Sequence, residues 1–368
     1  MGAKFLKVGY NFTSDLLEFI TSSRSSNSDD DTINRIYEVY GSRAESSLLS
    51  ARPKFRIPDI SRNDFAYHVR KLSDAGVYFD YTLNTSDLGS KSDIKGRECE
   101  VKEYIRFLVD CGVDCITVAL PIMAQWIRDI SQSVKIEVST IAHIDTVTQA
   151  KIWKDLFGVN KICGALHKNR DFPFLRSLSN YCNKNDVELV LMVNEFCGSG
   201  VKIEDTGYCS ATSCILRDHC YQLHSLDYNI RDVLDGDYPM GFCISSRNDS
   251  SAWLKMNFIR PEDLGAYSTI GINHFKVTGR TGSTSLIKRI SNAYLAESYT
   301  GNLLDLWKHL ETIGKSDDIA FSPTHVILNP TLDGFIEAWT GKDGLICANE
   351  VCGVSCDYCD KFFAKHCL

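Results

Sequence analysis

The sequence predicts an α/β fold, a (β/α)8 barrel of the TIM type, and three observations lead to this prediction. Short runs rich in β-branched and aromatic residues recur along the 368 residues of the chain. The segments between these runs carry apolar residues at helical spacing. The regular alternation of the two kinds of segment indicates a parallel sheet with helical crossovers, and in one chain of this length it favours a closed barrel over an open sheet.

Eight runs are the expected strands: Phe5–Tyr10, Ile36–Tyr40, Tyr78–Leu83, Cys115–Leu120, Lys135–Ser139, Lys161–Gly164, Val187–Val193 and His274–Thr278. The clearest expected helices are Val101–Cys111, Thr146–Leu156, Phe172–Cys182 and, after the eighth strand, Ser285–Ser298. About eighty residues separate the seventh strand from the eighth, and a long tail follows the last helix. We therefore expect a barrel over residues 1–310, which includes a cysteine-rich insertion over 194–257, and a C-terminal extension over 311–368.

Charge and hydropathy exclude several classes of protein. The formal net charge is −7, so no overall basic field would attract nucleic acid or an anionic membrane. No stretch approaches the roughly 18 consecutive apolar residues that a membrane span needs. Residues Met1–Tyr10 lack the apolar core of a secretion signal. The sequence therefore predicts a cytoplasmic protein with no membrane or nucleic-acid partner.

Fifteen cysteines are the outstanding feature of the composition. Thiols stay reduced in the cytosol, so metal binding is a better explanation for clustered cysteines than disulfide bonds. Five cysteines lie in apolar segments and are expected to be core residues: Cys99, Cys111, Cys115, Cys163 and Cys182. The other ten fall into two clusters, one in the insertion and one in the tail.

The insertion supplies the first candidate metal site, at Cys197, Cys214, Cys220 and Cys243. These spacings are too irregular for the paired knuckles of a zinc ribbon, whereas four thiolates on long loops can hold a [4Fe–4S] cluster. Cys197 follows the seventh strand closely, where barrel enzymes place their active sites. A structural zinc and unliganded thiols remain as alternatives, and Cys209 could replace one of the four ligands.

The tail supplies a second candidate metal site, with Cys347, Cys352, Cys356 and Cys359 as its ligands and Cys367 as a spare. The spacing Cys352-x3-Cys356-x2-Cys359 is that of radical S-adenosylmethionine enzymes, but such triads follow the first strand of a barrel. The prediction for the tail is therefore zinc or a second iron–sulfur cluster, with plain reduced thiols as the alternative.

Polar residues at the ends of expected strands are the candidates for binding and chemistry. Arg280 follows the eighth strand and could bind a carboxylate or phosphate, and Asn84 and Arg170 are further candidate substrate ligands. Glu195 and His143 are the candidate catalytic acid–base residues. For each of them a salt bridge, a cap or a structural hydrogen bond is the competing interpretation.

Four segments resemble the peptidase U32 family: Val193–Cys197 (VNEFC), Ser213–His224 (SCILRDHCYQLH), Asn257–Leu264 (NFIRPEDL) and His274–Arg280 (HFKVTGR). The resemblance implies a barrel with a [4Fe–4S] cluster on four cysteines. It also implies oxygen-independent hydroxylation in biosynthesis, with prephenate as the oxygen donor. The stretch Gly198–Ser213 is longer than in many relatives, and the additional modules of the RNA-modifying members are not evident. The expected substrate is therefore a small or carrier-bound molecule.

Two other functions remain open. The chain could be a non-catalytic iron–sulfur subunit that works with a partner subunit or an electron-transfer protein. It could also be a protease, as the family's name suggests, although the sequence contains no His-Glu-x-x-His motif and no protease signature around a nucleophile.

Overall fold

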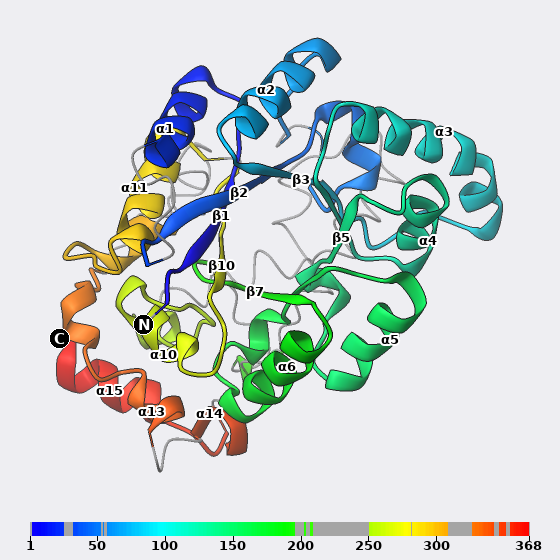
Figure 1. Cartoon of the computed structure of the whole chain (residues 1–368). Helices are drawn as coiled ribbons and strands as arrows, with labels where there is room; N and C mark the ends of the chain where they lie inside the picture. The colour runs from blue at the N-terminus through cyan, green and yellow to red at the C-terminus, as the bar shows by residue number, and fades with distance from the viewer. Residues whose placement is uncertain are drawn as a thin grey trace, which may run out of the picture.

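Eight parallel strands close into a barrel in the order β1-β10-β7-β6-β5-β4-β3-β2, as predicted (Figure 1). The computed structural model describes residues 2–25, 32–52, 54, 57–195, 202–203, 207–208, 250–280, 282–307, 326–341, 346–350 and 354–367. The barrel strands are β1 (Phe5–Gly9), β2 (Arg35–Gly41), β3 (Tyr78–Leu83), β4 (Cys115–Val118), β5 (Lys135–Val138), β6 (Lys161–Cys163), β7 (Glu188–Met192) and β10 (His274–Val277). All eight expected strands are therefore confirmed. The short strands β8 (Lys202–Ile203) and β9 (Gly207–Tyr208) pair with each other in a separate antiparallel sheet.

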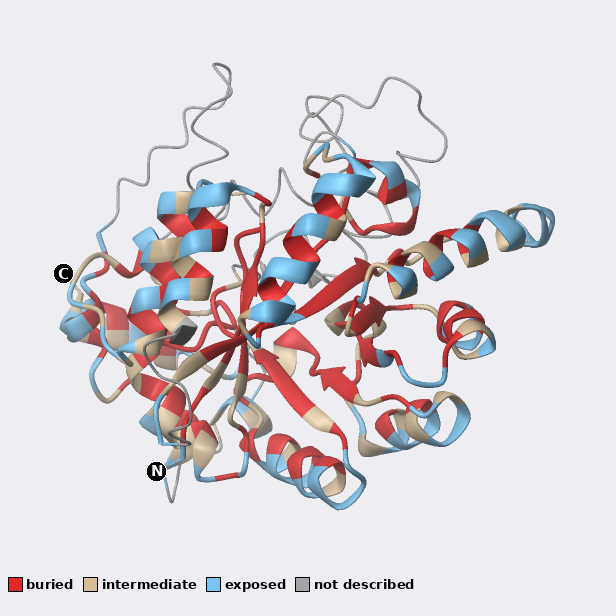
Figure 2. Cartoon of the chain, turned by 45° about the horizontal axis from the view of Figure 1, so that its top comes forward, coloured by how far each residue is buried: buried red, intermediate tan, exposed pale blue. Residues whose placement is uncertain are grey.

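Helices follow the strands and cover the outside of the barrel. They are α1 (Ser14–Ser25), α2 (Arg62–Asp74), α3 (Lys91–Asp110), α4 (Pro121–Ile130), α5 (Val147–Phe157), α6 (Phe172–Lys184), α10 (Leu264–Ser268) and α11 (Thr284–Leu295). Reciprocal capping boxes begin α3 at Ser90 and α5 at Thr146, and they satisfy backbone amides that have no partner within the helix. Figure 2 shows that these helices bury the face that lies against the strands. In the part of the chain that is described, no helix combines the length and the apolar character that crossing a bilayer requires.

The strands alternate between apolar side chains that face the helices and polar side chains that face the barrel axis. In β5, for example, Glu137 stands between Ile136 and Val138, and all three are buried. Lys7 in β1 and Lys276 in β10 stand at the same kind of position and contact Glu137 across the barrel. Because successive side chains of a strand point to opposite faces, the apolar neighbours must pack against the surrounding helices. The interior of this barrel is therefore built from charged groups.

The described part of the tail packs against one side of the barrel, beside α10 (Figure 1). It contains three short helices, α13 (Glu337–Thr340), α14 (Ile346–Asn349) and α15 (Tyr358–His366). Helix α15 contacts the segment that ends the insertion, where Lys255 Nζ lies 2.7 Å from the carboxylate of Asp360. Cys359 is buried at this contact, and its thiol donates to the carbonyl oxygen of Leu254 at 3.5 Å.

A close approach of two backbones occurs at Gly9, the last residue of β1. A side-chain carbon at this position would lie 2.8 Å from Cα of Arg280, in the loop that follows β10. Protein atoms do not approach each other this closely without strain, so glycine is required for the loop to pass over the end of β1. The position of Arg280 therefore depends on the absence of a side chain in the neighbouring strand.

Replacing Gly9 by alanine should destabilise the protein by about 1–3 kcal/mol, because the backbone of the Arg280 loop must move to make room. The matched control is Gly96→Ala in the exposed part of α3, where a new methyl group would have no atom within 4 Å. That substitution should stabilise the protein by about 0.5–1 kcal/mol, since alanine favours helix. Urea unfolding of both variants measures the difference, and equal effects would contradict the close approach at Gly9.

Candidate active site

The carboxyl ends of the eight strands lie at one end of the barrel, which we call the barrel mouth. The strands are parallel, so the loops after β3, β5, β7 and β10 all emerge there. These loops carry Asn84, His143, Glu195 and Arg280 respectively. The structure thus brings four of the predicted site residues to the same end of the barrel.

Arg280 lies at the barrel mouth and is buried. Nη1 donates to the hydroxyl of Thr82, and Nη2 donates to the hydroxyl of Ser50 at 3.5 Å. The guanidinium carbon lies 5.8 Å from the centre of the Tyr40 ring. Burial, together with the nearby positive charge of Arg52, lowers the pKa of Arg280 to about 10. The group remains charged at neutral pH, although its surroundings oppose the charge.

Asn84 holds the loop between β2 and α2 against the barrel mouth. Its side-chain oxygen accepts a hydrogen bond from the amide of Ala51 at 3.2 Å, and its amide donates to the hydroxyl of Ser139 at 3.4 Å. Ala51 lies between Ser50 and Arg52, so Asn84 fixes the segment that faces Arg280. Asn84 therefore positions other residues of the mouth, and substrate binding by its side chain stays a prediction.

His143 forms a pair with His167, which comes from the loop after β6. The ring centres lie 5.5 Å apart, and Nε2 of His167 is 3.7 Å from a carboxylate oxygen of Asp145. His143 adopts a left-handed backbone conformation with φ of 51°, which is unusual for a residue other than glycine. Burial lowers the pKa of both imidazoles below 6.5, so both are neutral at neutral pH and able to accept a proton.

Asn194 fixes the chain where it leaves β7. Its amide donates to the carbonyl oxygens of Thr278 at 3.1 Å and Leu306 at 3.0 Å, and its side-chain oxygen accepts from the amide of Thr278 at 2.6 Å. Glu195 follows directly, and its negative charge is among those that act on the phenol of Tyr40. The chain therefore enters the insertion beside the loop that carries Arg280.

Arg170, which the sequence predicts as a substrate ligand, lies away from this group. Its guanidinium donates to the carbonyl oxygens of Leu254 at 2.9 Å and Met256 at 2.5 Å. It also lies over the ring of Trp339, at 4.5 Å, and is buried. These contacts join the end of the insertion to the tail and give Arg170 a structural role.

The cysteines of the insertion lie outside the described residues, as does Cys352 in the tail, so both predicted metal sites stay predictions. Of the described tail cysteines, Cys359 is buried against Leu254, and the sulfur of Cys367 lies 3.6 Å from the hydroxyl of Thr331. Cys347 is exposed and lies in the neighbourhood of Cys356.

The sequence analysis missed a network of charges inside the barrel, formed by Lys7, Glu38, Asp80, Glu137, Lys161 and Lys276; we call it the inner charge network. Lys7 Nζ lies at its centre, 2.5 Å from Asp80, 2.5 Å from Glu137 and 3.2 Å from Glu38. Lys276 Nζ lies 3.1 Å from the other oxygen of Glu137, and Lys161 pairs with Glu38. A partial signal was available, because every member except Lys161 is a charge between two apolar or aromatic neighbours in a strand, but this pattern does not indicate which charges meet.

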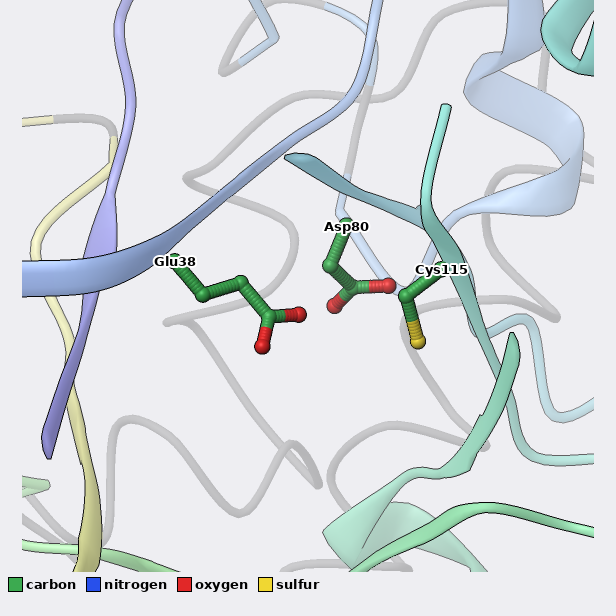
Figure 3. A group of neighbouring side chains, drawn as sticks. All are labelled: Glu38, Asp80 and Cys115. Carbon is green, nitrogen blue, oxygen red and sulfur yellow. The ribbon is translucent and has the colours of Figure 1, made fainter. Parts of the chain in front are cut away.

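Three members of this region could in principle hold a metal ion. Ligand atoms of Glu38, Asp80 and Cys115 lie within 4.8 Å of one another, and Figure 3 shows the three side chains converging in the barrel. However, the ammonium group of Lys7 already supplies a positive charge to both carboxylates. Burial also raises the pKa of the Cys115 thiol well above 9.0, which opposes the thiolate that a metal requires. The donor set therefore does not fit a metal ion.

The carboxylates of the inner charge network differ in their protonation. Burial by itself would raise the pKa of Glu137, but Lys276 and Lys7 lower it to about 2. For Asp80 the effect of burial exceeds that of Lys7, and the pKa of this carboxyl is raised. Glu137 is therefore the firmly ionised partner of the central lysine.

Comparisons with known proteins agree with the resemblance noted above. The family model described as peptidase family U32 matches residues 38–298. The chain is 26% identical to an uncharacterized protease of Methanocaldococcus jannaschii over 310 residues. This alignment covers 82% of this chain and 81% of that protein. Among solved structures, a U32 peptidase aligns with a TM-score of 0.38 at 15% identity, over 53% of this chain and 70% of that one. A D-psicose 3-epimerase from Clostridium cellulolyticum aligns with a TM-score of 0.39 at 11% identity, over 81% of this chain and 96% of that one.

Replacing Lys7 by methionine should destabilise the protein by about 3–5 kcal/mol, because three buried carboxylates lose their common cation. The matched control is Lys102→Met in α3, where the lysine pairs with Glu98 at 2.7 Å and Asp129 at 2.9 Å on the surface. Its loss should change the free energy of unfolding little, since water and salt screen exposed ion pairs. Urea unfolding measures the stability of both variants. Similar losses of unfolding free energy in Lys7→Met and Lys102→Met would contradict the central role of Lys7.

The contribution of Glu137 to stability should disappear in acid. Its pKa is about 2 in the folded protein and 4.5 ordinarily, so the ionised group stabilises the fold above pH 4.5 and this contribution is lost as the pH falls from 4.5 to 2. The difference in unfolding free energy between wild type and Glu137→Gln should therefore shrink across this interval. Unfolding measured over a pH series checks this prediction, with Glu98→Gln as the surface control. A difference between wild type and Glu137→Gln that stays constant with pH would contradict the lowered pKa of Glu137.

Proposed function

This chain belongs to peptidase family U32, and from that premise we propose that it is an iron–sulfur enzyme. The proposed activity is an oxygen-independent hydroxylation, or a related redox modification, of a small or carrier-bound biosynthetic substrate. The proposed site is the barrel mouth, where the loops after β3, β5, β7 and β10 gather the polar side chains. Prephenate is the oxygen donor that the family resemblance implies.

The anchoring of Asn194 is the observation that carries the proposal. Its three hydrogen bonds fix the chain beside the loop after β10, and Cys197 comes three residues later in the sequence. A cluster held by Cys197, Cys214, Cys220 and Cys243 would therefore begin at the barrel mouth. Four thiols are the donor set of a [4Fe–4S] cluster, which supplies one-electron chemistry when bound.

The described residues of the mouth suit the handling of an acidic substrate. Arg280 presents a charged group that can bind a carboxylate or a phosphate. His143 is neutral at neutral pH and can accept a proton from the substrate, and Glu195 lies on the loop that leads to Cys197. These assignments give binding to Arg280 and proton transfer to His143 and Glu195.

Proteolysis through a cysteine nucleophile is the less favoured function. Burial raises the pKa of Cys163 to about 11 and that of Cys182 to about 12, and the pKa of Cys115 is also well above its ordinary value. A protease needs a thiolate, and these three environments oppose one. Cys115, Cys163 and Cys182 are therefore core residues, as the sequence predicts, whereas Cys111 is only partly buried and the prediction is wrong for Cys99, which is exposed on α3.

Metal analysis tests the proposal. The full chain, purified without oxygen, should contain about four iron and four sulfide ions and absorb visible light. Cys197→Ala, Cys214→Ala and Cys220→Ala should each lose most of the iron, whereas Cys99→Ala, at an exposed position of α3, should keep it. Colourless wild-type protein, or full iron content in all three variants, would reject the ligand assignment. Zinc or additional iron that is lost in Cys356→Ala would assign the tail site.

A further inference from the structure

Arg280 is a buried cation that no described carboxylate contacts, although the charge of Asp80 acts on it from a longer distance. Among the described residues, no carboxylate oxygen lies within 4.0 Å of its guanidinium, which donates hydrogen bonds to the hydroxyls of Thr82 and Ser50. The three buried lysines of the inner charge network behave differently, because each contacts at least one carboxylate. An enclosed charge without a counter-ion is costly, so the protein gains if an anion binds there.

Arg52 adds a second positive charge near Arg280, because it follows Ser50 by two residues and the hydroxyl of Ser50 accepts a hydrogen bond from Arg280. It is half-buried in the loop between β2 and α2, and its charge helps to lower the pKa of Arg280. Within the described part of the chain its guanidinium forms no ion pair. Two neighbouring guanidinium groups repel each other, and an anion that contacts both would remove this repulsion.

The surrounding residues hold these two arginines in place. The hydroxyl of Thr82 donates to the carbonyl oxygen of Gly41 at 3.2 Å, which leaves its oxygen to accept from Arg280. Asn84 holds the amide of Ala51, between Ser50 and Arg52. The ring of Tyr40 lies near both Arg280 and the inner charge network, with its centre 5.8 Å from the guanidinium carbon of Arg280 and 4.4 Å from Lys276 Nζ. The arrangement is fixed before any ligand arrives.

We infer that Arg280 and Arg52, with the hydroxyls of Ser50 and Thr82, form an anion subsite that binds a carboxylate or phosphate group of a small organic acid. The subsite lies at the barrel mouth, so the anionic group would hold the rest of the molecule beside His143 and Glu195. The identification of this anion as the substrate rests on the proposed function. The binding of the anion is inferred from the buried charge of Arg280 and is independent of that function.

The test uses the full chain, purified without oxygen and transferred to a buffer of low anion content. The probes are succinate, inorganic phosphate and succinamide, which has the shape of succinate without its charge. Calorimetry and thermal unfolding should show that succinate or phosphate binds and raises the unfolding temperature, and that succinamide does neither. The tighter of the two anions identifies the headgroup as carboxylate or phosphate.

Two variants assign the binding to the arginines. Arg52→Ala should weaken the binding by at least about tenfold, and Arg280→Lys, which keeps the charge but loses the planar fork, should weaken it as well. Arg176→Ala, at an exposed position of α6, is the matched control and should bind like wild type. In the low-anion buffer without added succinate or phosphate, Arg52→Ala should unfold at the same or a higher temperature than wild type, because the positive charge that repels Arg280 has been removed.

Several results would overturn the inference. One is that Arg52→Ala and Arg280→Lys bind the anions as tightly as wild type, and another is that succinamide binds as tightly as succinate. A third is that Arg52→Ala unfolds at a lower temperature than wild type without added anions, which would make Arg52 a structural contact. Iron and sulfide are measured on the same preparations. Protein that binds the anions but contains no iron would contradict the proposed function and support the anion subsite. Protein that contains the cluster but binds neither anion would contradict the anion subsite and support the proposed function.

Discussion

The ammonium group of Lys7, held between the carboxylates of Glu38, Asp80 and Glu137, is the interaction on which the rest of the barrel depends. These four residues come from β1, β2, β3 and β5, so a single cation joins half of the strands at the axis. A barrel of this kind usually fills its interior with branched apolar side chains. Here the interior is held by charge, and each strand must keep its register for the charges to meet.

Charge is balanced in the centre of the barrel and unbalanced at its mouth. Lys276 pairs with Glu137 and lies 4.4 Å from the centre of the Tyr40 ring, whereas Arg280, 5.8 Å from the same centre, donates hydrogen bonds only to hydroxyls among the described residues. The carboxylates of the inner charge network contact lysines, and none of them forms an ion pair with Arg280. The stability of the fold and the affinity of the mouth for anions thus follow from one distribution of charge.

The strands and the main helices could be predicted from the sequence because their periodicity is local. The location of Arg280 and Asn84 at the mouth followed from the strand ends, since parallel strands share one carboxyl edge. The inner charge network could not be predicted in the same way, because a lone Lys7 or Glu137 in a strand gives no indication of its partner across the barrel. The contacts of Arg170 could not be predicted for a related reason, because Leu254 and Trp339 lie far from it in the sequence; substrate binding by Arg170 stays a prediction.

The insertion leaves and rejoins the barrel at adjacent points, since the amide of Ile259 donates to the carbonyl oxygen of Val193 at 2.8 Å. A segment whose two ends are clamped together in this way can change its length at little entropic cost, because closing a longer loop adds only a logarithmic term. The barrel could therefore exchange one such segment for another during evolution without repacking a strand. New chemistry could arise above an unchanged scaffold.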